Sequence, residues 1–377
     1  MNTRVVKLKR QPEDFQVEEL TAFAASGGPF ALYRLTKRSL GTPEAIDAIV
    51  RRWDIARARI SFGGLKDRHA LTTQHVTIDR GPRRALRQSG FDLAYVGQAG
   101  RPFAPRDISA NRFSIVMRDL SKEALARAES ALADPAIPNY FDDQRFGSLG
   151  ESGEYIGRAW CEERYERALW LALAEPNEHD RPDDRERKRI LREKWGDWPA
   201  CKAALDRSHV RSIVSFLADR PGDFKGALGR TRKEMRSLWL AAFQSFLWNR
   251  LLSDLVRESC RDAVPVELKS GTVLFPGSGG LPEIALPLPS ARLKTADARL
   301  ERVLAAEGIA LRQLRIQHPK DSFFSKGERA SLVRPAGLTH ASGADELYPG
   351  RRKLSLRFDL PRGSYATILV KRLTANG

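Results

Sequence analysis

The distribution of apolar and polar positions predicts six β-strands in the first 150 residues. These strands are Arg4–Lys9, Phe15–Glu18, Pro29–Leu35, Ile60–Phe62, Thr73–Asp79 and Asn111–Leu120. Two stretches with apolar residues at helical spacing lie among them. The first begins at Thr42, the expected N-cap, with Pro43 as its first helical residue, and the second, Ser121–Leu132, begins with a serine cap. The pattern predicts mixed α and β structure for this part of the chain.

Beyond Gly150 the pattern becomes mainly helical up to about residue 330. We expect a charge-dense helix over Asp180–Lys194 and a long helix over Ser237–Glu258. The mixed signs of the first favour a solvated face with ion pairs between residues one turn apart. The Gly- and Pro-rich segment Phe275–Pro289 predicts turns and short strands.

The end of the chain returns to the pattern of the beginning. Lys353–Leu360 alternates apolar with polar residues and predicts a strand, and a Pro-Arg-Gly turn leads into a second predicted strand, Tyr365–Leu373. Because both ends of the chain carry sheet-forming patterns, we expect them to form one domain. Its expected bounds are 1–150 plus 334–377, interrupted by an inserted domain, 151–333.

The charge of the chain indicates a polyanionic partner. Its 377 residues include 64 Lys and Arg against 47 Asp and Glu, a net charge of +17. Such an excess is typical of nucleic-acid-binding proteins, although a general solubility surplus of arginine is the alternative. The last 27 residues hold seven basic residues and one acidic residue. On two adjacent strands, that density would make a surface suited to phosphates.

Several classes of protein are excluded by composition. The three cysteines, Cys161, Cys201 and Cys260, are too far apart for a zinc-binding cluster and too few for a disulfide framework. The longest apolar run, Ala168–Ala174, is far shorter than the roughly 20 residues of a membrane-spanning helix. No glycine-rich nucleotide-binding motif is present. We therefore expect a cytoplasmic protein that uses no metal and no cofactor and does not bind membranes. A monomer is a separate expectation, which composition does not test.

One short loop combines glycines with an isolated carboxylate. Between two predicted strands, Gly63-Gly64 precedes Asp67, which stands between Lys66 and Arg68. Neighbouring cations favour the ionised carboxylate, which suits a nucleophile or an electrostatic stabiliser. An ordinary polar hairpin loop is the alternative interpretation.

A second segment, Pro138–Gly147, places aromatic rings beside amide and guanidinium groups. Tyr140 and Phe141 precede Gln144 and Arg145, a combination suited to stacking on bases and reading their edges. Burial of the aromatic rings in a core is the alternative. The segment also contains Asp142 and Asp143, which with Asp67 could form the carboxylate pair of a glycoside hydrolase.

Four motifs in this order resemble the TruD family of tRNA pseudouridine synthases. They are Pro12–Glu19, Gly64–Gln74, Asn139–Gly147 and Leu360–Thr367. The resemblance is strong in the first 150 and last 40 residues and loose in the middle, where the family has its own inserted domain. It implies an α+β fold: a pseudouridine-synthase catalytic domain with a mostly antiparallel sheet and flanking helices, interrupted by an inserted α/β TRUD domain. The RNA is expected between the two domains.

The resemblance also implies an activity and a set of site residues. The reaction is isomerisation of a uridine in tRNA, typically uridine 13 of the D arm, to pseudouridine. Asp67 matches the family's essential aspartate. Phe15, Asn139 and Tyr365 match residues that line the pocket of the target base, and Lys9 and Phe141 match neighbouring positions.

The chain departs from the family pattern in three places, of which the second and third concern RNA contacts. Asp142 stands where a glycine is usual, Gly97–Ala110 lacks a common basic run, and Lys371-Arg372 replaces a common Arg-Glu.

Two other functions stay open. A non-catalytic basic RNA-binding protein would bind RNA without modifying it, and a nucleoside or glycoside hydrolase would release free base or sugar.

Overall fold

Two compact units divide the chain, which the computed structural model describes over residues 6–277, 280–294 and 296–375. Residues 6–137 and 333–375 form the first unit, and the described part of 138–332 forms the second. The chain leaves the first unit at β8 (Ile137–Pro138) and returns at β13 (Leu332–Val333). The division by contacts therefore places the segment from residue 138 to 150 with the second unit. The assignment of a catalytic and an inserted domain stays a prediction.

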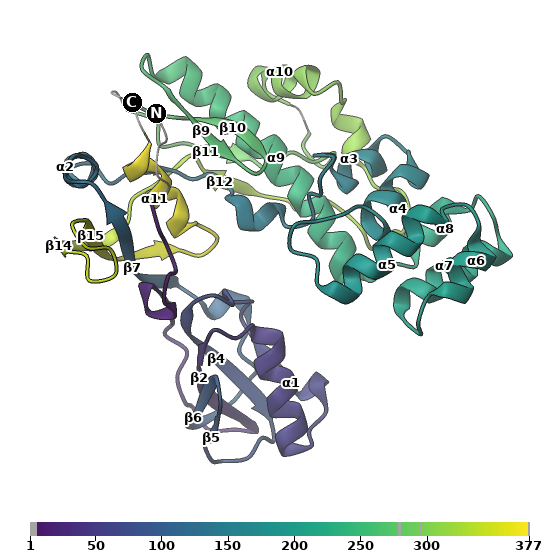
Figure 1. Cartoon of the computed structure of the whole chain (residues 1–377), viewed down its shortest axis with the longest axis horizontal. Coiled ribbons are helices and arrows are strands. Elements are labelled where there is room, and N and C mark those ends of the chain that lie inside the picture. Colours follow the sequence, from purple (N-terminus) through teal and green to yellow (C-terminus); the bar gives the residue numbers. More distant parts are fainter. Residues whose placement is uncertain (1–5, 278–279, 295, 376–377) are drawn as a thin grey trace. The chain divides into compact units, whose positions relative to one another are not determined.

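A nine-stranded sheet forms the framework of the first unit. Its strands in spatial order are β14 (Ala336–Ala344), β15 (Arg352–Pro361), β7 (Ala110–Leu120), β1 (Phe15–Leu20), β4 (Leu71–Asp79), β2 (Phe30–Arg38), β6 (Phe91–Ala99) and β5 (Leu86–Gln88), and β3 (Ile60–Phe62) also pairs with β4. The β1–β4 pair is parallel, and the other pairs are antiparallel. Figure 1 shows β7 and β15, from distant parts of the sequence, side by side. This mostly antiparallel sheet confirms the predicted α+β class.

Helices of the first unit cover apolar positions of the sheet. In α1 (Thr42–Trp53), Ala45, Ile46 and Ile49 are fully buried in one cluster with side chains of β2, β4 and β6. The helices α2 (Lys122–Ala131), capped by Ser121 as predicted, and α11 (Ala366–Thr374) contact each other. Three short 3₁₀ helices complete this unit: Pro12–Asp14, Arg57–Arg59 and Pro105–Asp107.

The last predicted strand, Tyr365–Leu373, is wrong, because this segment forms helix α11 with Tyr365 as its N-cap. Ala366, Leu369 and Leu373 are buried and recur at helical spacing. Packing of this apolar face outweighs the β-branched residues that favoured a strand. The basic end of the chain therefore presents one strand and one helix, not two adjacent strands.

Two smaller predictions also change. The first two residues of the predicted strand Arg4–Lys9 lie outside the described residues, and Lys7 forms an isolated bridge with Arg118 in place of a strand. The N-cap of α1 is Gly41, and Thr42 is the first helical residue. The hydroxyl of Thr42 is consequently available for contacts outside the helix.

The second unit is mainly helical. Its helices are α3 (Ile156–Cys161), α4 (Tyr165–Leu173), α5 (Pro182–Glu193), α6 (Trp198–Ala204), α7 (His209–Asp219), α8 (Phe224–Gly229), α9 (Lys233–Ser259) and α10 (Ala298–Ala306), with 3₁₀ helices at Asp143–Phe146 and Leu311–Leu314. Two antiparallel pairs add short sheets: the hairpin of β9 (Val264–Leu268) with β10 (Gly271–Phe275), and β11 (Ala285–Pro287) with β12 (Glu328–Ala330), which are distant in sequence.

The long helix α9, green in Figure 1, forms the core of the second unit. It contacts α3, α10, β10 and β11 and buries Phe243, Leu247 and Trp248 completely. Its boundaries confirm the predicted long helix to within a few residues. None of the helices in the described part of the chain combines the length and apolar character needed to cross a membrane.

Candidate functional site

Asp67 lies on a loop between β3 and β4, which we call the Asp67 loop (Gly63–Ala70). The loop begins in a closely packed position. A Cβ atom on Gly63 would lie 2.5 Å from the side chain of Ile108 and 2.9 Å from the ring of Phe103. Only glycine fits there without displacing these two side chains.

Side chains from α1 and β4 hold the loop at its backbone. The Thr42 hydroxyl accepts a hydrogen bond from the Lys66 N–H (3.0 Å) and donates one to Gln74 Oε1 (2.8 Å). Gln74 Nε2 donates to the carbonyl of Gly64 (3.2 Å). Because Thr42 and Gln74 are fully buried, their hydrogen bonds form away from competing water. They fix the position of the loop relative to the sheet.

The Asp67 carboxylate has two partners. Lys9 Nζ forms an ion pair with Oδ2, and the His69 N–H donates to Oδ1 at 2.9 Å. Burial by itself raises the pKa of Asp67, but the positive charge of Lys9 and these hydrogen bonds outweigh it and hold the pKa below its usual value. The side chain is 19 % exposed. Asp67 is thus ionised at neutral pH, immobilised and still accessible.

A buried lysine, Lys37, binds backbone carbonyls of the same loop and of the segment before α1. Lys37 Nζ donates to the carbonyls of Asp67 and Leu40, both at 2.7 Å, and the residue is 1 % exposed. Burial lowers the pKa of Lys37 to about 8, although the nearby Asp67 charge opposes that change. The ammonium of Lys37 therefore fixes the backbone of Asp67, while Lys9 fixes its side chain.

The residue before Asp67 joins the loop to β1 and β7. Lys66 Nζ lies 3.1 Å from Glu19 Oε1 and donates to Asn111 Oδ1 at 2.6 Å. Glu19 is 2 % exposed, and its other oxygen accepts the His75 N–H at 2.8 Å. Burial lowers the pKa of Lys66, and the charge of Glu19 opposes that change. This buried ion pair orients the loop independently of the Asp67 side chain.

The structure brings three of the predicted site residues together: Lys9, Phe15 and Asp67. Besides its ion pair, Lys9 Nζ lies 4.4 Å from the centroid of the Phe15 ring, a cation–π contact. The ring also packs edge-on against Phe113, and Phe15 is 5 % exposed. Phe15 therefore supports Lys9 and has little free surface of its own.

Tyr365, another predicted site residue, lies in the first unit at the start of α11 and is partly exposed. The turn before it contains Arg362, whose charge acts on Lys66 and, after burial, contributes to lowering the pKa of that lysine. This interaction brings the turn into the neighbourhood of the Asp67 loop. The place of Tyr365 in the pocket of the target base stays a prediction.

Asn139, predicted to line the base pocket, lies in the second unit with its amide group fully engaged. Its Nδ2 donates to the carbonyl of Ala330 at 3.0 Å, and its Oδ1 accepts from Arg329 at 2.6 Å. The backbone N–H donates to the carbonyl of Ser331 at 2.9 Å. Asn139 therefore fixes the local backbone in this structure.

Phe141 also lies in the second unit, where Asn249 holds its backbone by two hydrogen bonds, of 2.9 and 2.8 Å. The Arg329 guanidinium lies 4.2 Å from the centroid of the Phe141 ring. The preceding Tyr140 is fully buried and donates to the carbonyl of Leu274 at 2.6 Å. The structure therefore shows the alternative interpretation of this segment, in which the aromatic rings are buried.

The arrangement around Asp67 suits covalent or proton-transfer chemistry by a single carboxylate. Asp142 and Asp143, considered as partners for a hydrolase, belong to the second unit, where Asp143 accepts a hydrogen bond from the Lys269 N–H at 2.7 Å. Within the described ranges, no group of three or more His, Cys, Asp or Glu side chains is placed to hold a metal ion.

Sequence reasoning missed Glu19 and Lys37. Each is a charged residue in phase with the buried apolar positions of its strand: Glu19 follows Phe15 and Val17, and Lys37 follows Tyr33 and Leu35. A charge at such a position was the available signal. Their roles depend on the parallel pairing of β1 with β4 and on the position of β2 beside β4. Neither pairing follows from the local pattern.

Comparison with known proteins gives one consistent result. The sequence profile of the tRNA pseudouridine synthase D (TruD) family matches residues 3–268 and 279–373. A protein of Methanocaldococcus jannaschii named "Probable tRNA pseudouridine synthase D 2" is 30 % identical over 387 residues, covering 97 % of this chain and 91 % of that protein. The tRNA pseudouridine synthase D of Aquifex aeolicus is 28 % identical and covers 98 % of each chain. A crystal structure described as TruD from Methanosarcina mazei matches 98 % of this chain and 93 % of its own, with a TM-score of 0.71 and 25 % identity.

Proposed function

This chain belongs to the tRNA pseudouridine synthase D (TruD) family, and from that premise we propose that it converts uridine 13 in the D arm of tRNA to pseudouridine, with Asp67 as the catalytic residue. The observation that carries this proposal is the state of Asp67. Its carboxylate is held ionised by Lys9 and His69 on a loop that Gly63 and Thr42 keep in place.

The reaction rearranges bonds without net oxidation or hydrolysis. The bond from C1′ of the ribose to N1 of uracil breaks, the base turns, and C5 forms the new bond to C1′. The proton on C5 leaves, and N1 gains a proton, so the atoms balance. An ionised Asp67 can act in two ways: as a nucleophile at C1′ or as a base that removes a sugar proton. Both roles require the carboxylate to be unprotonated, which its lowered pKa ensures.

The target uridine must leave the RNA stack before Asp67 reaches its sugar, at a cost of a few kcal/mol. We assign the stacking contact to Tyr365, because it is partly exposed, whereas Phe15 is 5 % exposed and carries Lys9 on its face. We assign Asn139 and Phe141 to the proposed base pocket only because they match the family motif. Lys9 sets the charge state of Asp67.

The test is incubation of the purified protein with an in vitro transcribed tRNA that has uridine at position 13. Pseudouridine is then mapped by carbodiimide-dependent stops in reverse transcription. We expect one new stop, at the nucleotide directly 3′ of position 13, and none in a matched transcript with cytidine at position 13. Release of free uracil would support a hydrolase, and RNA binding without any new stop would support a non-catalytic RNA-binding protein.

A further inference from the structure

A small basic hollow lies in the second unit, and none of the site residues assigned above belongs to its lining. Its volume is about 310 Å³, and it is formed by residues 290–292, 314–316, 320 and 322–324. We call it the Phe323 hollow. Phe323 is 52 % exposed, which is unusual for a large apolar side chain, and the Arg292 guanidinium lies 4.8 Å from the centroid of its ring.

The charges around the Phe323 hollow have one sign. Arg292, Arg315 and Lys320 line it, all three are exposed, and no carboxylate belongs to its lining. Nor does any carboxylate in the described part of the chain form an ion pair with these three side chains. Asp321, which follows Lys320 in sequence, is instead paired with Arg236 at 2.9 Å. Three cations are therefore available to a ligand.

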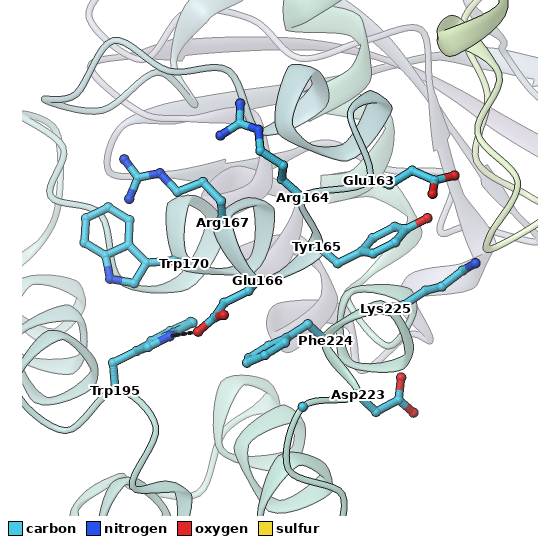
Figure 2. A pocket seen from close by; sticks show the side chains of 11 residues that line it. Glu163, Arg164, Tyr165, Glu166, Arg167, Trp170, Trp195, Asp223, Phe224 and Lys225 are labelled. Carbon is cyan, nitrogen blue, oxygen red and sulfur yellow. Dashed lines mark hydrogen bonds between the residues drawn. The ribbon is translucent and has the colours of Figure 1, made fainter.

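A larger pocket in the same unit shows the opposite arrangement. This pocket, of about 720 Å³, lies between α4 and α8 and contains Arg164, Arg167 and Lys225 together with four aromatic side chains. Figure 2 shows carboxylates of Glu163, Glu166 and Asp223 among them; Trp195 donates to Glu166 at 3.1 Å. 

The arginines of that pocket are already neutralised. Arg167 is paired with Glu154 and Arg164 with Glu162, each at 2.5 Å. A polyanion would have to displace these carboxylates, so size alone does not make this pocket a site for RNA. The smaller hollow has the better charge for an anionic ligand.

We propose that the Phe323 hollow is an accessory RNA-binding site that takes one unpaired nucleotide of the substrate, with its base stacked on Phe323 and the adjoining phosphates on Arg292, Arg315 and Lys320. Stacking on an aromatic face does not depend on base identity, and unpaired cations are what phosphate contacts require. A volume near 310 Å³ is at the lower end for ligand pockets and suits a single base. The inference rests on the proposed function for its choice of RNA as the partner.

The electrostatic part of the proposal is tested by the salt dependence of tRNA binding. In the triple variant R292Q/R315Q/K320Q, we expect weaker binding and a slope of log affinity against log salt that is smaller by about two. The matched control is R187Q/K188Q/R189Q on α5, which removes the same charge from residues paired with Asp184, Asp180 and Glu186. The control should leave the slope within about half a unit of wild type.

The stacking part is tested by Phe323→Leu and Phe323→Tyr. Loss of the ring should weaken tRNA binding roughly five- to 100-fold without changing the salt slope, and tyrosine should retain most of the affinity. Equal slopes for wild type and the charge variant, or equal affinities for Phe323→Leu and wild type, would overturn the proposal. Binding is measured apart from modification. A protein that shows these losses but makes no pseudouridine would contradict the proposed function and not this inference.

Discussion

The Asp67 loop and the Phe323 hollow differ in whether their basic side chains are paired with carboxylates. Around Asp67, the side chains of Lys9 and Lys66 form ion pairs, and Lys37 donates to backbone carbonyls. In the Phe323 hollow, none of the carboxylates in the described part of the chain forms an ion pair with the three exposed cations. The basic residues that contribute to the net charge of +17 therefore have two different roles. Some hold a single carboxylate in place, and others are exposed on the surface.

The two arrangements also have different energetic consequences. The charges of Lys66 and Glu19 have been largely removed from water, so each depends on its partner, and loss of one partner is costly. Exposed cations in the Phe323 hollow cost little to keep and contribute little to stability. We therefore expect changes in the loop to affect folding or the chemical step. Changes in the hollow should affect binding alone.

The largest effect on stability is expected from Lys66→Met. It leaves Glu19, 2 % exposed, as a buried charge without its ion-pair partner. We expect the free energy of unfolding of the first unit to fall by about 3–5 kcal/mol, as measured by urea denaturation. The double variant E19L/K66M, which removes both charges, should be less destabilised than Lys66→Met. A loss below about 1 kcal/mol in the single variant would show that this pair is not buried as described.

Next in size is the effect of Tyr365 on catalysis. If its ring stacks on the displaced uracil, Tyr365→Leu should lower kcat/KM roughly five- to 100-fold, and Tyr365→Phe should keep most of the activity. Single-turnover rates with saturating enzyme separate this effect from tRNA binding. Equal rates for the leucine and phenylalanine variants would remove Tyr365 from the proposed base pocket.

The smallest effect at neutral pH is expected from Lys9→Met, because its influence depends on pH. Without Lys9, only the contacts of His69 oppose the effect of burial, so the pKa of Asp67 is higher than in wild type and the carboxylate becomes protonated at a higher pH. Relative to wild type, kcat/KM should fall at acidic pH and should recover toward neutral pH. Lys9→Arg, which keeps the charge, should follow the wild-type profile. A loss that is the same at every pH would mean that Lys9 does not act through the ionisation of Asp67.

Local pattern predicted much of the fold. Strands β1, β3 and β4 and the loop that carries Asp67 follow from alternation and from Gly63-Gly64, because each signal lies within a few residues. Helix α11 was missed because Leu, Ile and Val suit a strand as well as a helix, and the choice depends on packing against neighbouring elements.

The candidate site shows the same limit. Asp67 and Lys9 could be named from motifs, and the structure joins them by an ion pair. The roles of Glu19 and Lys37 required the order of the strands, which depends on contacts between segments more than 30 residues apart in sequence. The cations of the Phe323 hollow could be identified only from the ion pairs of the structure, because composition does not show which carboxylates are already paired.

The central claim is that Asp67 performs the chemistry while other residues bind the RNA. Its most direct test compares Asp67→Asn with wild type on the same tRNA, measuring the dissociation constant and the single-turnover rate of pseudouridine formation. Asparagine keeps the shape of the side chain and removes its charge. We predict a dissociation constant within about twofold of wild type and a rate lower by roughly 1,000-fold or more. Pseudouridine formation at a near wild-type rate would contradict the claim.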